Sequence, residues 1–78
     1  METPDERPDW LTQLDREILE VLSSGLVLTP SIIAENIDRS RTGVNQRLSS
    51  LQAGGLIKRV DRGKYKITDK GKAISSVV

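Results

Sequence analysis

The 78-residue sequence contains no cysteine and no histidine. A chain without cysteine has no disulfide framework, no thiolate nucleophile and no thiolate metal ligand, and a chain without histidine has no imidazole base or imidazole ligand. Carboxylates are present, but they are not placed in the pairs that acid–base catalysis needs. These absences exclude most enzyme chemistry. The sequence predicts no catalytic residue, no metal site, no cofactor and no evident small-molecule ligand.

Long apolar runs are also missing. No run approaches the roughly 18 residues needed to cross a bilayer, and the residues after Met1 are acidic rather than basic, so we expect neither a membrane span nor a signal peptide. The lack of cysteine fits a reducing, cytoplasmic location. A chain of this length forms one domain, and such a domain buries only roughly 60% of the surface of its unfolded form. Its stability is therefore expected to be modest, or to depend on a partner.

What the sequence does contain is charge sorted by position. The segment 1–38 has nine acidic and two basic residues, a balance of −7, whereas 39–78 has ten basic and two acidic residues, a balance of +8. The formal net charge of +1 is therefore a cancellation. A basic half of this kind presents a surface that attracts polyanions, although an uneven charge pattern alone does not distinguish nucleic acid from other partners.

The N-terminal segment, residues 1–11, is predicted to be a flexible acidic tail, and residues 12–78 to be the folded domain. Two prolines and five charged residues lie among the first nine positions, a composition typical of solvated tails. Trp10, the only tryptophan, is expected to cover either the core or a dimer seam. The acidic tail either competes with a polyanion for the basic half or only keeps the protein in solution.

Cap signals and apolar spacing predict the first two helices. Thr12 and Asp15 have the spacing of an N-terminal cap, and a helix ending near residues 24–25 follows. Thr29 before Pro30 marks the start of a second, shorter helix. The apolar positions expected to face inward are Leu14, Ile18, Val21 and Leu22 in the first helix and Ile33, Ala34 and Ile37 in the second.

A third helix is predicted over residues 41–53, with Ser40 as its cap and Gly54-Gly55 as its stop. Val44, Leu48 and Leu51 form one stripe and fix its buried side. No acidic residue occurs between Arg39 and Val60. The opposite side is polar and uncharged, and Arg41 and Arg47 flank the stripe. The polar side consists of Thr42, Asn45, Gln46, Ser49 and Ser50.

The rest of the chain predicts a β-hairpin and a short last helix. Two β-like runs, 56–60 and 64–68, are separated by a turn in which Gly63 can take the left-handed position. Tyr65 and Ile67 should point to a packed face, and Lys64 and Lys66 to a basic one. The run 26–28 can add an edge strand. Thr68 and Asp69 can cap a last helix whose apolar residues are Ala73, Ile74, Val77 and Val78.

The order and spacing of these pieces resemble a winged helix-turn-helix domain, an α+β fold with a three-helix core, a hairpin wing of two or three strands and a short C-terminal helix. The matching segments are "TPSIIAENI" at 29–37, "SRTGVNQRLSSL" at 40–51, "GLI" at 55–57 and "RGKYKITDKG" at 62–71. They are most similar to small archaeal winged-helix regulators of the haloarchaeal phage-repressor type. The resemblance covers about residues 12–74.

The resemblance implies a repressor-like transcriptional regulator of double-stranded DNA whose third helix enters the major groove. The residue types agree, because Asn45 and Gln46 can pair bidentately with adenine, Arg41 suits guanine, and Thr42 can contact base or phosphate. These four are the candidate base-reading residues. The candidate backbone contacts are Arg39, Ser40, Arg47, Lys58, Arg59, Arg62, Lys64 and Lys66, with Arg62 at the wing tip able to reach a phosphate or the minor groove.

The sequence departs from the family pattern at Gly43 and in the length of the wing. It also leaves open the oligomeric state and an alternative function. Gly43 lies inside the third helix, where it either allows close approach to DNA or is a tolerated poor helix former. The wing is short. A homodimer through the N-terminal and C-terminal helices is possible, unless the last helix simply packs on the first helix of its own chain. The alternative function is a winged-helix module that binds protein or RNA without specific DNA contact.

Overall fold

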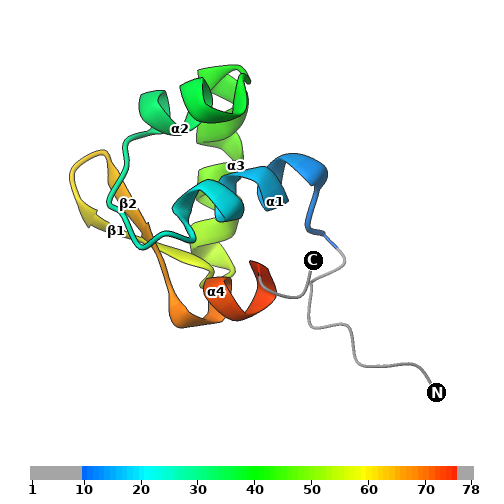
Figure 1. The fold of residues 1–78 in the computed structure, drawn as a ribbon, viewed down its shortest axis with the longest axis vertical. Coiled ribbons are helices and arrows are strands. Elements are labelled where there is room, and N and C mark those ends of the chain that lie inside the picture. Colours follow the sequence, from blue (N-terminus) through cyan, green and yellow to red (C-terminus); the bar gives the residue numbers. More distant parts are fainter. Residues whose placement is uncertain (1–9, 76–78) are drawn as a thin grey trace.

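The computed structural model describes residues 10–75 and contains four helices and a two-stranded antiparallel sheet (Figure 1). The elements, in chain order, are α1 (Gln13–Leu22), α2 (Pro30–Ile37), α3 (Arg41–Ala53), β1 (Ile57–Asp61), β2 (Lys64–Ile67) and α4 (Asp69–Ser75). This order confirms the α+β winged-helix prediction. Most of the expected tail, and the expected apolar contacts of Val77 and Val78, lie outside the described residues. None of the helices within residues 10–75 has the length and hydropathy needed to cross a membrane.

The helices begin where the cap residues predict. Thr12 forms a full capping box with Asp15: its hydroxyl accepts from the Asp15 N–H at 3.1 Å, and its own N–H donates to Asp15 Oδ2 at 2.9 Å. Thr29, followed by Pro30, caps α2, and Ser40 caps α3. Such caps satisfy backbone N–H groups that have no partner inside the helix. Local sequence therefore sets the starting points of the first three helices.

The hydrophobic core is formed where α1 meets the other helices and the start of the hairpin. Its buried members are Ile18, Leu19, Leu22, Ile33, Ala34, Val44, Leu48, Leu51, Leu56, Ile57, Ile67 and Ile74. One part of the expected α1 stripe is wrong, because Leu19 is buried and Val21 is only half-buried. The reason is that α1 packs against four other elements, α2, α3, α4 and β2. Its buried face is therefore wider than the predicted stripe and is shifted from Val21 toward Leu19.

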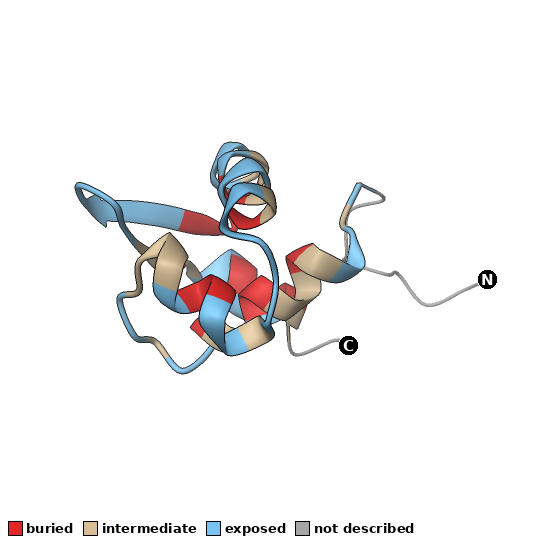
Figure 2. Ribbon diagram, turned by 90° about the horizontal axis from the view of Figure 1, so that it is seen from above, coloured by how far each residue is buried: buried red, intermediate tan, exposed pale blue. Residues whose placement is uncertain are grey.

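The hairpin projects from this core and is buried only at its base (Figure 2). Gly63 has the positive φ of 67° that its turn position predicts, and a bulge interrupts the pairing between Arg59 and Asp61. The expected edge strand at 26–28 is reduced to a single bridge, in which Leu28 exchanges two backbone hydrogen bonds with Tyr65. The pairing cannot continue past Leu28, because Thr29 is the N-cap of α2, and Leu26 and Val27 before it are exposed.

α4 is fixed against the connection between α3 and β1. The Thr68 hydroxyl donates to the Gly55 carbonyl at 2.7 Å, and Lys70 Nζ donates to the Gly54 carbonyl at 3.2 Å. Gly71 is buried, and a Cβ added there would lie 2.1 Å from the Leu56 carbonyl oxygen. Only glycine permits this close approach. α4 also packs on α1 of the same chain. This is the arrangement that was considered as the alternative to a dimer contact through the last helix.

Candidate nucleic-acid interface

The outward face of α3 carries all four candidate base-reading residues. Arg41, Thr42, Asn45 and Gln46 are exposed, whereas the Val44, Leu48 and Leu51 stripe is completely buried. The capped start of α3 and this stripe together fix which side of the helix faces solvent. The exposed side is free of carboxylates, so that the polar groups of α3 can approach the edges of bases without repelling phosphates.

Arg41 is the first residue of α3 and is held by a residue of α2. Its Nη1 donates to Ser31 Oγ at 3.2 Å. Ser31 was not among the sequence candidates. It is half-buried near the start of α2, and no short-range pattern links it to a residue ten positions later.

Arg47, a candidate phosphate contact, forms an ion pair inside the domain instead. Its Nε and Nη2 donate to the two carboxylate oxygens of Asp15 at 2.7 and 2.8 Å. Asp15 is completely buried, and 27% of the Arg47 side chain is exposed. The hydrogen bonds from the guanidinium to Asp15 raise the pKa of Arg47. The pairing gives Arg47 a structural role that joins α1 to α3, and its contact with a phosphate stays a prediction.

Arg39, which precedes α3, is also paired. Its Nε and Nη2 donate to Glu17 of α1 at 3.1 and 3.0 Å. The hydrogen bond with Arg39, and then that with Gln13, lowers the pKa of Glu17, and the pKa of Arg39 is raised in turn. This pair lies at the surface, where 45% of the Arg39 side chain is exposed. A surface pair contributes little to stability, so Arg39 can exchange Glu17 for a phosphate more readily than Arg47 can leave Asp15.

The hairpin supplies the remaining cations. Lys58, Arg59, Arg62 and Lys64 are exposed, and Lys66 is half-buried. Lys58 and Lys66 are direct cross-strand partners, as are Arg59 and the half-buried Tyr65. Like charges directly opposite each other destabilise a sheet. An anion bound across the Lys58–Lys66 pair would remove that repulsion, which suits a surface that meets phosphates.

Asp15 is a second residue for which sequence analysis missed a role, namely its ion pair with Arg47. The spacing from Thr12 identified its capping function, and that function is present. Its second partner, Arg47, lies 32 positions away. The sequence around α3 contains no acid that could pair with Arg47. The acid that does pair with it, Asp15, lies on α1. Arg47 lay beside the buried stripe in the sequence pattern, which was the one available sign that it faces the core side.

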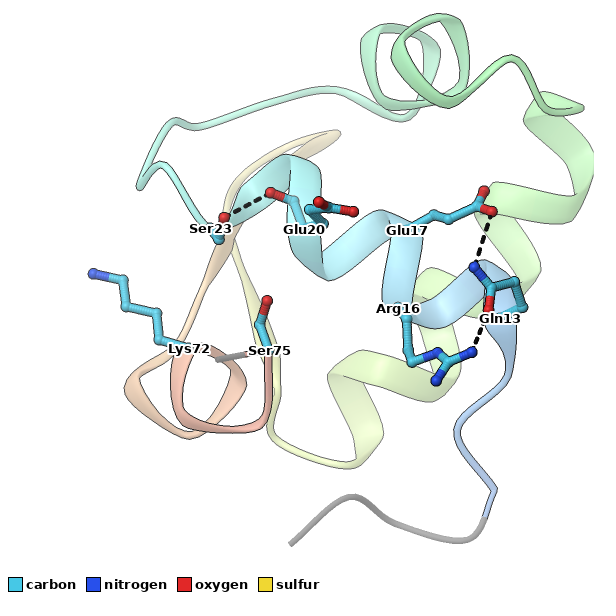
Figure 3. A pocket seen from close by; sticks show the side chains of 7 residues that line it. All are labelled: Gln13, Arg16, Glu17, Glu20, Ser23, Lys72 and Ser75. Carbon is cyan, nitrogen blue, oxygen red and sulfur yellow. Dashed lines mark hydrogen bonds between the residues drawn. The ribbon is translucent and has the colours of Figure 1, made fainter. Parts of the chain in front are cut away.

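A second surface feature is a hollow between α1 and α4, with a volume of about 670 Å³ (Figure 3). Charges of both signs line it, including Arg16, Glu17, Glu20 and Lys72. It is open to solvent. No buried polar side-chain atom without a hydrogen-bond partner is found among the described residues. Residues 10–75 also hold no group of acidic side chains suited to a metal ion.

A three-helix core with an exposed, carboxylate-free third helix beside a basic hairpin defines a winged-helix DNA-binding regulator, a class of protein that is not enzymatic. The chain belongs to the winged helix-turn-helix phage repressor family, whose profile matches residues 5–76. This match confirms the phage-repressor resemblance of the sequence. Among curated proteins, none matches the chain.

One solved structure similar to the chain is the quinone-bound YodB from B. subtilis. It superposes with a TM-score of 0.74 and is 27% identical, over 85% of this chain and 73% of YodB. The quinone is a ligand of YodB. Family and neighbour together place this chain among DNA-binding transcription regulators.

Proposed function

We propose that the protein binds double-stranded DNA sequence-specifically, with α3 in the major groove and the β1–β2 hairpin on the backbone, as a repressor-like regulator. The observation that carries this proposal is the outward face of α3, where the candidate reading residues Arg41, Thr42, Asn45 and Gln46 are all exposed and no acid lies among them. The amides of Asn45 and Gln46 suit adenine, and the guanidinium of Arg41 suits guanine. We expect such binding to take place in the cytoplasm of an archaeal cell.

The backbone contacts that support this geometry come mainly from the hairpin. Phosphate contacts position a protein on the duplex without reading its sequence. The exposed hairpin cations are Lys58, Arg59, Arg62 and Lys64, with Lys66 beside them. Ser40 and Arg39 lie immediately before α3, within reach of the same strand of DNA if the start of the helix enters the groove. The short wing limits Arg62 to a phosphate or shallow minor-groove contact.

The test begins with selection of bound fragments from a random duplex library, followed by fluorescence anisotropy on the selected site. Gln46→Ala or Asn45→Ala should relax the preference at one base position and cost about 1 to 3 kcal/mol on that site. The control is Gln52→Ala, which removes an exposed glutamine near the other end of α3 and should leave the preference unchanged. Equal loss of affinity on every sequence after Gln46→Ala would remove α3 as the reading element.

The second candidate is a protein-binding or RNA-binding module. The exposed face of α3 lacks the aromatic and aliphatic anchors that dominate protein interfaces, which favours DNA. Anisotropy with random duplex DNA and with RNA of the same sequence, each at two salt concentrations, separates the candidates. Tighter binding to RNA than to duplex DNA, or no binding to either, would favour the second candidate.

A further inference from the structure

The arginines around the start and middle of α3 differ in which part of the guanidinium is free. An arginine makes bidentate contacts through a fork of two parallel N–H donors. Arg39 and Arg47 both use the Nε–Nη2 edge to hold a carboxylate. Among residues 10–75, Arg41 makes one side-chain hydrogen bond, from Nη1 to Ser31. Its Nε–Nη2 edge, the edge that its two neighbours use for anions, therefore remains available.

Ser31 is suited to hold Arg41 while leaving its Nε–Nη2 edge free. Its hydroxyl is a neutral acceptor, and a single neutral hydrogen bond is weaker than the charge-assisted pairs of Arg39 and Arg47. It is also half-buried on α2, which packs against α3, so that its position is set by the core. A flexible arginine side chain loses rotamer freedom when it binds. Fixing one nitrogen beforehand reduces that loss and limits the direction of the other donors.

We propose that Ser31 is a specificity-determining positioning residue: it aims the free Nε–Nη2 edge of Arg41 at a guanine in the major groove. The two acceptors O6 and N7 of guanine match this edge, which is the commonest specific contact of arginine with DNA. The bound site should then contain a G·C pair opposite the start of α3, and the preference for it should depend on a residue that touches no base. The inference rests on the proposed function, because it requires duplex DNA at α3.

The experiment compares two variants that differ only in the acceptor. Ser31→Thr and Ser31→Val place side chains of nearly equal shape at the same position, and only threonine keeps the hydroxyl. Each is measured by anisotropy on the selected duplex and on duplexes with the G·C pair changed. The wild-type protein should prefer the G·C pair by about 5-fold to 150-fold, as a good bidentate contact gives. Ser31→Thr should keep most of this preference.

Ser31→Val should lose at least several-fold of the preference, while its affinity for a random duplex stays unchanged. A merely structural role would instead lower affinity for all duplexes together. Circular dichroism melts show whether each variant is folded at the assay temperature. If Ser31→Val is unstable, Ser31→Ala replaces it, and Ser23→Ala is the matched control: Ser23 is an exposed serine with one side-chain hydrogen bond, to Glu20 of α1.

The outcomes separate this inference from the proposed function. If Arg41→Ala abolishes the G·C preference but Ser31→Val retains it, Ser31 does not position Arg41, whereas DNA reading by α3 stands. If Arg41→Ala also leaves the preference intact, the guanine assignment is wrong. If the wild-type protein shows no sequence preference at all, the proposed function fails together with the inference.

Discussion

At the scale of single residues, the arginines of the basic half are distinguished by their partners. Asp15 is completely buried and accepts three hydrogen bonds, two from Arg47 and one from the Thr12 backbone. The cost of burying a carboxylate is offset only when its lone pairs are satisfied in this way. Arg62, in contrast, is exposed at the hairpin turn. Arg47 and Arg62 have the same formal charge, but removing Arg47 should destabilise the fold, whereas removing Arg62 should leave its stability nearly unchanged.

Arg47→Ala is expected to destabilise the domain by about 3 kcal/mol, because removing one partner of a buried ion pair leaves the other charge buried and unpaired. This value is at the lower end of the destabilisation usually seen when a buried pair is broken, because Arg47 is partly exposed to water. Arg62→Ala should change the free energy of unfolding by no more than about 0.5 kcal/mol. Urea denaturation measures both. Equal effects from the two substitutions would contradict the structural assignment of Arg47.

Gly71→Ala is expected to destabilise the fold by about 1 to 3 kcal/mol. The new Cβ would lie 2.1 Å from the Leu56 carbonyl oxygen and 2.8 Å from Ile67 Cγ1, so α4 would have to move away from the connection to β1. Lys72→Ala, on the exposed side of the same helix, is the control and should have little effect. Thermal melts followed by circular dichroism test the difference. A wild-type melting temperature for Gly71→Ala would show that α4 is not held so closely.

The Glu17–Arg39 pair should make stability depend on pH. Because Arg39 lowers the pKa of Glu17 below its ordinary value of 4.5, the pair stabilises the folded state above that pH. The contribution is lost as the pH falls through the lowered pKa of the folded state. The melting temperature of the wild type should therefore exceed that of Glu17→Gln at pH 6, and the gap should close at more acidic pH. A gap independent of pH would exclude the pair as its cause.

At the scale of elements, α3 and the hairpin divide the proposed work between reading and holding. α3 presents amides and one positioned guanidinium, and the hairpin presents mainly point charges on a projecting ribbon (Figure 2). Contacts to phosphates release counterions, whereas contacts to bases do not. The salt dependence of binding therefore distinguishes the two elements experimentally.

Removing one hairpin cation, by Lys58→Ala or Arg62→Ala, should reduce the magnitude of the slope of log K against log salt concentration by about 1. Affinity should fall by a similar factor on every sequence. Lys72→Ala removes a cation of α4 that lines the hollow beside α1, and serves as the control with an unchanged slope. Anisotropy titrations at four salt concentrations give the slopes. If the hairpin variants keep the wild-type slope, the hairpin does not touch the backbone.

At the scale of the whole molecule, the charge split of the sequence is distributed by element, and the two signs meet where Arg39 pairs with Glu17 and where Lys72 lines a hollow with Glu20. The acids of the described N-terminal half lie on α1, on α2 and in the turn after α2, and the cations lie largely on α3, the hairpin and α4. One domain with about four phosphate contacts should bind with a slope near −4, and a dimer on two half-sites with about twice that value.

Dimerisation is the corresponding prediction for assembly. The hollow between α1 and α4 carries charges of both signs (Figure 3), and a two-fold contact through these helices would use the same surface of both copies. Sedimentation velocity at micromolar concentration, with and without the selected duplex, measures the stoichiometry. A monomer in both conditions, together with a slope near −4, would show that one copy suffices.

The sequence by itself determined the order of the elements, three of the helix caps, the turn at Gly63 and the side of α3 that faces solvent. These features depend on residues within a few positions of one another, through capping, periodicity and turn geometry. It therefore predicted the winged-helix fold and placed the base-reading candidates on an exposed surface. It also located the basic half, because charge is a property of composition.

Only the tertiary structure decided which cations are already used. Asp15 with Arg47, Glu17 with Arg39, and Ser31 with Arg41 are joined across 32, 22 and 10 positions. The burial of Leu19 depends on the elements packed against α1. The need for glycine at position 71 depends on the nearby Leu56 carbonyl. Such contacts depend on how helices dock, and docking is set by packing of the whole core rather than by any local pattern.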